Sequence, residues 1–193
     1  MVSNGSSPAG SISDWEGDVV LADGATVHMR AMVPGDEPLL ARMYEGLSAD
    51  SVYYRFFSPV PRATATALEM NRLGAEGHVT RVALLGDDIV AAARYDLVSP
   101  GVAEVAFVVT DEHQGRGVGT LLLEHLAVLA RAHGIHTFAA DTLPNNGKML
   151  GMFAAAATMS SPSSATLVMC PSSPSRFISK AVAVARGTGE KNR

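Results

Sequence analysis

A glycine-rich turn, Gln114–Thr120 (QGRGVGT), constrains the fold more than any other stretch of this chain, because it joins two runs of different hydrophobic period. The run before it, Val102–Thr110, is almost entirely apolar, which is typical of a strand near the centre of a sheet and covered on both faces. The run after it, Gly117–His133, repeats apolar residues at helical spacing. The predicted buried stripe of this helix holds Val118, Leu122, Leu126 and Leu129.

The remaining sequence predicts a mixed α/β sheet rather than an all-parallel one. Two strand-like runs, VTRVALL and IVAAARYDLV, are separated by the turn Gly86–Asp88, which is a hairpin signal. Helical patterns precede this hairpin, and Asp36 is predicted to cap the first of them. The other predicted elements are a first strand at Thr26–Met32, helices within 36–47, 49–57 and 64–74, a strand at 135–141 and a helix at 145–157.

Composition argues against several classes of function. The chain has 193 residues, 47% hydrophobic and 18% charged, which is enough for one globular domain with a core. Its net charge of −4 disfavours a nucleic-acid platform, which usually presents a basic face. No apolar run approaches the roughly 18 residues of a membrane span, and the N-terminus lacks a signal-peptide pattern. The single cysteine, Cys170, cannot form an intramolecular disulfide, so we expect a cytoplasmic protein without membrane or nucleic-acid partners.

The glycine turn predicts an anion site. Glycines let the backbone approach a phosphate closely, and the N-terminus of the following helix adds roughly half a positive charge. Arg116 could add a side-chain donor at the rim of the site. A structural alternative remains, in which the glycines serve a tight turn and packing only.

Two other phosphate-binding motifs fit the turn less well. A P-loop needs a Lys-Ser or Lys-Thr pair, and the turn has none. A dinucleotide fingerprint is matched by Gly115 and Gly117, and Asp141 lies at a suitable distance downstream. However, Thr120 occupies the position of the third glycine, and the five residues TDEHQ separate the turn from the strand.

The stretch Gln114–Gly119 resembles the Q/R-x-x-G-x-G/A motif of the GNAT N-acetyltransferases, and it has the same place between a strand and a helix. The resemblance covers residues 25–157 and implies a GNAT fold that binds acetyl-CoA. It also implies acetyl transfer from that cofactor to an amine. The segments VHMRAMVPGDEPLLARMYEGLS and YYRFFSP are most similar to bacterial GNAT domains that acetylate protein lysines, so a protein lysine is the acceptor that we expect.

The resemblance implies a catalytic role for Glu104, because the family commonly places its proton-accepting glutamate on the strand before the glycine loop. Glu104 is also the only charge in its apolar run. Burial there would disfavour the charged carboxylate and so raise the pKa of Glu104 toward the value that a general base needs. The structural alternative is a solvated Glu104 near the start of its strand, or one paired with an arginine such as Arg94.

The resemblance also implies a set of cofactor contacts. The backbone of Val108 and Val109 would pair with the pantetheine arm as an added strand does. Asn146 matches a family asparagine that contacts the cofactor, although it could equally cap the helix that follows. Phe153 stands where many members have a tyrosine that protonates the leaving thiolate. The pyrophosphate would be held by Gln114, Gly115, Arg116, Gly117, Val118, Gly119 and Thr120.

The histidines show no metal-ligand spacing with each other or with Cys170, so we expect no metal site. The C-terminal region departs from the family pattern, since Ala157-Thr158 replaces the usual Gly-Phe. Strand character after it is weak and limited to SATLVMC and RFISKAVAVA. We expect a flexible lead-in at 1–18, a GNAT domain at 19–157 and a divergent Ser/Pro-rich tail at 158–193. Two alternative functions stay open, a small-molecule amine acetyltransferase and a non-catalytic acetyl-CoA-binding module.

Overall fold

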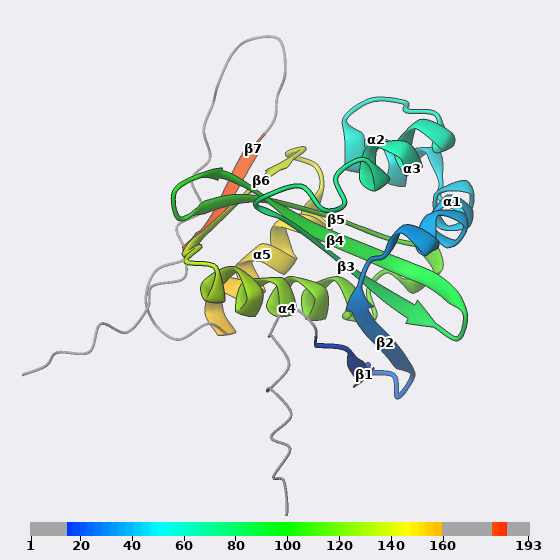
Figure 1. Ribbon diagram of the computed structural model, residues 1–193, viewed down its shortest axis with the longest axis horizontal. Coiled ribbons are helices and arrows are strands. Elements are labelled where there is room, and N and C mark those ends of the chain that lie inside the picture. The colour runs from blue at the N-terminus through cyan, green and yellow to red at the C-terminus, as the bar shows by residue number, and fades with distance from the viewer. Residues whose placement is uncertain (1–14, 160–178, 185–193) are drawn as a thin grey trace, which may run out of the picture.

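The computed structural model describes residues 15–159 and 179–184, which form one seven-stranded sheet flanked by helices (Figure 1). The strands follow one another across the sheet in chain order, and every neighbouring pair is antiparallel except β5 and β6. The predicted mixed α/β sheet is therefore confirmed. The strands are β1 Gly17–Val20, β2 Thr26–Ala31, β3 His78–Leu85, β4 Asp88–Ser99, β5 Val102–Val109, β6 Thr137–Thr142 and β7 Ser179–Val184.

Helices cover both faces of the sheet. Figure 1 shows α1, α2 and α3 over one face and α4 and α5 over the other. The helix α4 also supplies the crossover that a parallel pair requires, because it joins β5 to β6. The helices are α1 Glu37–Glu45, α2 Ala49–Phe56, α3 Arg62–Met70, α4 Val118–Ala132 and α5 Gly147–Met159, with 3₁₀ turns η2 Pro34–Asp36 and η3 Asp111–His113.

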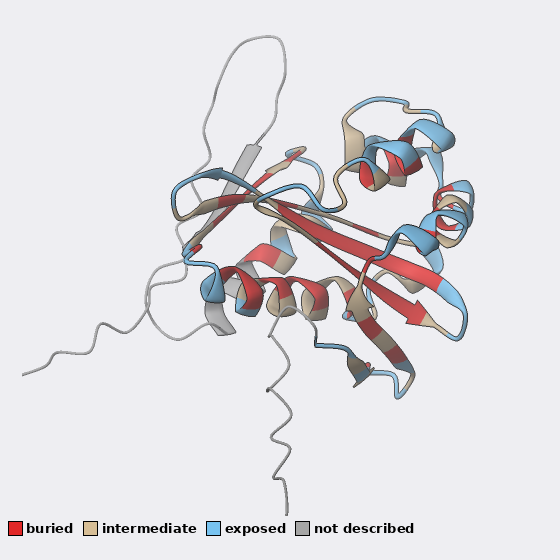
Figure 2. Ribbon diagram, viewed as in Figure 1, coloured by how far each residue is buried: buried red, intermediate tan, exposed pale blue. Residues whose placement is uncertain are grey.

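Two apolar cores lie on opposite sides of the sheet (Figure 2). The predicted stripe of α4 is confirmed, since its four apolar residues are all buried against β4, β5 and neighbouring strands. On the other side, Tyr44 and Leu40 of α1 pack with Val82 and Val108 of the sheet. The strand β5 is less covered than we predicted. Only Ala103, Val105 and Val108 of β5 are buried.

The strands β5 and β6 diverge at one point, and this divergence positions the candidate site. Their pairing runs over three residues and ends at Glu104 opposite Ala139. Both strands continue beyond this pair, β5 as far as Val109 and β6 as far as Thr142. An opening therefore forms between the two strands on the side toward the glycine turn.

The structure corrects three expectations about individual elements. The strand Thr26–Ala31, which we expected to be the first, is the second, because β1 precedes it. The four residues of β1 are half-buried or exposed, so their sequence carries little hydrophobic pattern. Asp36 stands at the N-cap of α1, but its carboxylate binds the Arg30 guanidinium and the Val33 amide instead of capping the helix. The predicted helix 64–74 begins and ends earlier, as α3.

The C-terminal segment RFISKAVAVA does contribute a strand. Ser179–Val184 pairs antiparallel with β6 along its whole length. The strand β6 is therefore covered on its outer edge. The other predicted tail strand, SATLVMC, lies outside the described residues.

Candidate active site

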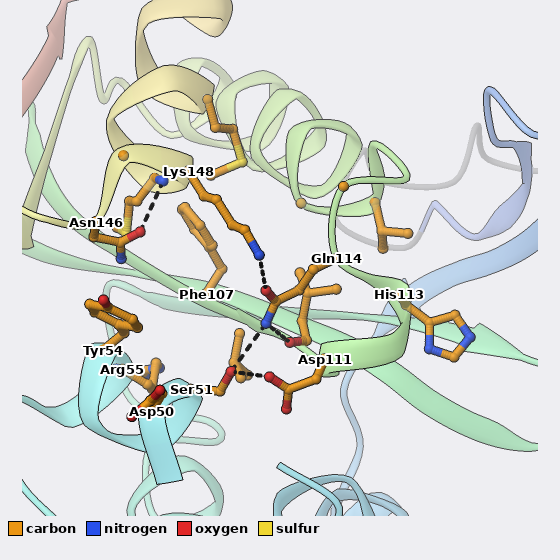
Figure 3. A pocket seen from close by; sticks show the side chains of 18 of the residues that line it. Asp50, Ser51, Tyr54, Arg55, Phe107, Asp111, His113, Gln114, Asn146 and Lys148 are labelled. Carbon is orange, nitrogen blue, oxygen red and sulfur yellow. Dashed lines mark hydrogen bonds between the residues drawn. The ribbon is translucent and has the colours of Figure 1, made fainter. Parts of the chain in front are cut away.

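An open cleft of about 760 Å³ lies among β5, α2, the glycine turn and the N-termini of α4 and α5 (Figure 3). Residues that the sequence analysis predicted form most of one wall of the cleft, and α2 and α5 supply the rest. The predicted cofactor residues that line the cleft are Val108, Val109, Gln114, Gly115, Gly117, Val118, Gly119, Thr120 and Asn146.

The N-terminus of α4 opens into this cleft. Gly117 is its N-cap with φ of 92°, a left-handed conformation that favours glycine, and no side chain caps the helix. The first intrahelical bond that involves this end runs from the Leu121 amide to the Gly117 carbonyl at 3.1 Å. The amides of Val118, Gly119 and Thr120 precede it, so they have no acceptor within the helix and suit an anion.

Gly119 allows α4 to lie close to β5 and α5. A Cβ atom at this position would stand 3.1 Å from Met152 Sδ and 3.5 Å from Val109 Cγ2. The first of these distances is shorter than an ordinary van der Waals contact. The glycine thus serves packing, while Gly117 serves the turn, so the two play different roles in the motif.

Gln114 links three sides of the cleft. Its Nε2 donates to Ser51 Oγ at 3.1 Å and to the Val109 carbonyl at 3.2 Å, and its Oε1 accepts from Lys148 Nζ at 2.9 Å (Figure 3). These bonds join α2, the end of β5 and the start of α5. Gln114 therefore holds the walls of the cleft in position.

Asp111 fixes α2 beside the glycine turn. Its carboxylate accepts from the Ser48 amide and hydroxyl, both at 2.9 Å, and from Ser51 Oγ at 2.6 Å. Burial opposes the charged form, but the hydrogen bonds from Ser51 and Ser48 outweigh it and hold the pKa of Asp111 below its usual value. The acid is consequently an anion in this anchor at neutral pH.

The backbone direction along β5 corrects one predicted contact. The Thr110 amide donates to Val90 of β4 at 2.9 Å, whereas the Val109 carbonyl faces Gln114. Successive peptide groups alternate sides along a strand, so Val109 and Phe107 present backbone groups to the opening while Val108 presents its own to β4. The sequence analysis therefore named Val108 in place of Phe107, although both residues line the cleft.

Glu104 lies at the closed end of the opening, on the last pair that joins β5 to β6. Its side chain is half-buried, and Asp96 of β4 stands directly opposite it. Its surroundings are therefore charged, and the apolar environment that we expected from its run of neighbours is wrong. The reason is that β4 contributes Arg94 and Asp96 to the same face of the sheet.

Arg116 differs from expectation, and Asn146 has the cap role that was one of its two alternatives. Arg116 does not line the cleft, and its Nε binds Asp23 Oδ2 at 2.5 Å instead. Asn146 does line it, but its Oδ1 accepts from the Met149 amide at 3.1 Å and so caps α5. Phe153, which stands in for a family tyrosine, is buried with its ring centroid 5.9 Å from that of Phe107.

The functional candidates that sequence reasoning missed come from elements far apart in the chain. Lys148, Ser51 and Asp111 reach the cleft from α5, α2 and η3, and only their three-dimensional arrangement brings them together. Phe107 could have been found from the strand alternation alone. Within residues 15–159 and 179–184, no group of three or more metal-ligating side chains is assembled. In the same residues no helix has the length and apolar character to cross a bilayer.

Comparison with known proteins assigns the chain to a family. The sequence pattern described as "Acetyltransferase (GNAT) family" matches residues 41–157, more than half of the chain. The chain belongs to the GNAT acetyltransferase family. The resemblance seen in the Gln114–Gly119 motif is thereby confirmed, and the cleft of this GNAT domain lies at the motif.

Three relatives describe how this GNAT domain compares with known proteins. Acetyltransferase Pat of Mycolicibacterium smegmatis is 33% identical over 138 residues, which make up 68% of this chain and 40% of Pat, so the chain spans less than half of that curated relative. The GNAT domain of S. lividans PAT superposes with a TM-score of 0.75 at 37% identity, covering 88% of this chain and 97% of that domain. RimL, described in complex with coenzyme A, shares the fold with a TM-score of 0.65 at 12% identity, covering 82% and 93% of the two chains.

Proposed function

We propose that this protein transfers an acetyl group from acetyl-CoA to an amine, and that the amine is a protein lysine. One observation carries the proposal. The uncapped N-terminus of α4 and the unpaired side of β5 open into the same cleft, and Glu104 lies on β5 where the pairing with β6 ends. A phosphate site, a strand edge and a carboxylate thus lie in the order in which acetyl-CoA and an amine would need them.

The donors in the cleft fit the phosphates of coenzyme A. The amides of residues 118–120 would bind the pyrophosphate, supported by the helix dipole. Lys148 Nζ lies on the facing wall, where it would supply a positive charge. Arg116 has no part in this assignment because it pairs with Asp23. A volume of about 760 Å³ is within the usual range for a ligand of this size.

The pantetheine arm would lie along β5 as an added strand. We assign its contacts to the backbone of Phe107 and Val109, because these residues face the opening. Phe107 is three residues beyond Glu104, or about 10 Å at the usual rise of a strand. A proton would reach Glu104 directly or through ordered water.

Glu104 would act as the proton acceptor. A lysine amine has a pKa of about 10.4, so it is protonated at neutral pH and has no lone pair for attack. Transfer of one proton to the Glu104 carboxylate leaves a neutral amine and a carboxylic acid. The amine then attacks the thioester carbonyl that acetyl-CoA supplies, a C–N bond forms as the C–S bond breaks, and the nitrogen passes its second proton to the departing thiolate or to solvent. The departing thiolate, with a thiol pKa of about 8.5, needs no strong acid, which agrees with an apolar Phe153 at the family's tyrosine position.

The acceptor is assigned from two lines of support. The segments most similar to lysine-acetylating domains include the second half of α2 with Tyr54, and α2 lines the cleft with Asp50 and Tyr54. A carboxylate and a phenol at the rim suit a cationic side chain. The identity to Pat and to the PAT domain points the same way. We place the reaction in the cytoplasm, since acetyl-CoA and the lysines of most intracellular proteins are found together there.

The test is transfer of radiolabelled acetyl groups from acetyl-CoA. Candidate acceptors are lysine-containing proteins, including acyl-CoA synthetases, together with polyamines and aminoglycosides as the small-molecule arm. Label on a protein lysine, identified by mass spectrometry and absent with Glu104→Gln, supports the proposal. Label only on the small amines would show that the acceptor is a small-molecule amine and not a protein lysine. No label on any acceptor by a protein that binds acetyl-CoA would favour a non-catalytic module.

A further inference from the structure

Six charged or titratable side chains gather between the sheet and helices α2 and α3. Arg55 of α2 pairs with Glu69 of α3, which also binds Arg94 Nε at 3.3 Å. Arg94 in turn pairs with Asp96. Asp96 Oδ1 binds Arg72 at 3.1 Å and His78 Nδ1 at 2.7 Å. The group, named here the arginine cluster, consists of Arg55, Glu69, Arg72, His78, Arg94 and Asp96.

The arginine cluster holds more positive than negative charge. It has three guanidinium groups and two carboxylates, and Glu69 and Arg94 are buried. Burial, with repulsion from Arg94 and Arg72, lowers the pKa of His78 to about 4, so His78 is neutral at pH 7. One guanidinium charge is therefore left over at neutral pH. Arg72 carries its charge on a side chain that is 42% exposed, whereas the buried Arg94 depends on the carboxylates around it for balance.

Glu104 is placed to balance this charge. Asp96 lies directly across the β4–β5 pair from Glu104, and Arg94 is two residues away on the same face of β4. Burial and repulsion from Arg55 lower the pKa of Arg94 to about 10, and attraction by Glu69 and Glu104 opposes that change. The Arg94 guanidinium and the Glu104 carboxylate are thus within electrostatic reach of each other.

Charged groups from the neighbouring elements complete the surroundings of Glu104. The strand β3 contributes His78, and β6 contributes Asp141, two residues beyond the partner of Glu104. The helical side contributes Arg55 and Glu69, which neutralise each other in their ion pair. Arg94 and Asp96 are the nearest of these charged groups to Glu104 along the β4–β5 ladder.

We propose that Arg94 is a positioning residue for catalysis, which keeps the Glu104 carboxylate ionised at the point where β5 and β6 separate, and that Asp96 opposes it. This inference rests on the proposed function. With Glu104 ionised, the charges of the cluster balance. When the carboxylate takes a proton from the acceptor ammonium, the surplus positive charge of the cluster returns. That charge favours release of the proton to solvent and readies Glu104 for the next cycle.

The proposal predicts shifts of opposite sign in two variants. The reaction needs ionised Glu104, so kcat/KM falls at low pH as Glu104 is protonated. The midpoint of this acid limb of the pH profile therefore reports the protonation of Glu104 in the free enzyme. Arg94→Gln removes the cation and moves that limb up by about one pH unit, whereas Asp96→Asn removes the facing anion and moves it down by a similar amount. Arg94→Lys keeps the charge and restores most of the wild-type profile. A purely structural role for the cluster would lower the rate without shifting the limb in opposite directions.

A titration that needs no activity separates this inference from the proposed function. The ¹³C signal of the Glu104 carboxyl, assigned with Glu104→Gln, is followed from pH 3 to 9 in each variant. Its midpoint is expected to rise in Arg94→Gln and to fall in Asp96→Asn. Unchanged midpoints, or shifts in the same direction, would overturn the proposal even if acetyl transfer is observed. Should Arg94→Gln fail to fold, the Asp96→Asn midpoint decides alone, and a rise or no change contradicts the proposal.

Discussion

Lys148 Nζ lies 2.9 Å from Gln114 Oε1, and this bond connects the start of α5 to the glycine turn across the cleft. The lysine is exposed, and its partner is a neutral amide rather than a carboxylate. Its charge is therefore not neutralised by this contact. A phosphate in the cleft would be a stronger partner, because its negative charge would add Coulomb attraction to a hydrogen bond that the lysine already donates.

Lys148→Met is expected to weaken acetyl-CoA binding about tenfold, since a charge-assisted contact to phosphate contributes roughly 1.4 kcal/mol or more. The dependence of Kd on salt should also become shallower. Arg131→Met, an exposed cation in the last turn of α4, serves as the matched control and should leave Kd unchanged. Calorimetric titration at two ionic strengths measures both effects. Equal or tighter binding by Lys148→Met would show that the lysine takes no part in phosphate binding.

Gly117→Glu is expected to reduce acetyl-CoA affinity by at least roughly 100-fold, because it puts a carboxylate at the phosphate site and blocks the helix terminus. Gly134→Glu is a close control. Both glycines have positive φ, 92° and 72°, and neither has an atom within 4 Å of an added Cβ. Both variants should lose similar stability, about 1 kcal/mol for the left-handed conformation. Similar affinity losses in the two variants would mean that the effect is general destabilisation.

Glu104→Gln is expected to lower kcat by roughly 100-fold or more at neutral pH, as removal of a general base does. The affinity for acetyl-CoA should stay within about twofold of wild type, because Glu104 does not line the cleft. Glu112→Gln, an exposed carboxylate in η3 beside the glycine turn, is the control. Full activity of Glu104→Gln from pH 6 to 9 would make the base assignment wrong.

His125 makes stability depend on pH away from the cleft. Its ring stacks on Trp15 with centroids 4.4 Å apart, and burial with repulsion from Arg81 lowers the pKa of His125 to about 4. Between this value and the unfolded value of about 6.5, the unfolded chain binds more protons, so the free energy of unfolding falls as pH drops through that window. His78 contributes in the same direction.

Denaturant unfolding at pH 7.5 and pH 5 tests this pH dependence. Wild type should lose stability at pH 5, and His125→Gln should lose less than wild type between the two pH values. The exposed His136 provides a control, since His136→Gln should follow wild type. A steeper loss in His125→Gln than in wild type would contradict the assigned direction.

Local patterns were sufficient to predict most of the fold. The helical stripe of α4, the hairpin at Gly86–Asp88 and the strand within RFISKAVAVA each follow from a period or turn signal confined to a few residues. The strand β1 was not predicted, because four half-buried or exposed residues carry too little pattern. The side chain of Asp36 was misassigned because its partner, Arg30, lies on a different element.

The candidate site could be predicted only as far as its motif extends. The glycine turn was recognisable, but side chains that reach a site from other elements follow from the fold alone. Arg116 pairs with Asp23, 93 residues away, and the charged face around Glu104 arises from strand pairing with β4. Lys148 and Ser51 meet Gln114 for the same reason. These tertiary contacts leave no signal in the local sequence.

The most direct test of the account is calorimetric titration of the 193-residue chain with acetyl-CoA, with NAD as the control ligand. We expect one acetyl-CoA to bind per chain with a micromolar Kd and NAD to give no binding heat. That result would establish the cleft at the N-terminus of α4 as a coenzyme A site and direct further work to acceptors. No acetyl-CoA binding by a protein that unfolds cooperatively, and is therefore folded at the start, would contradict the central claim.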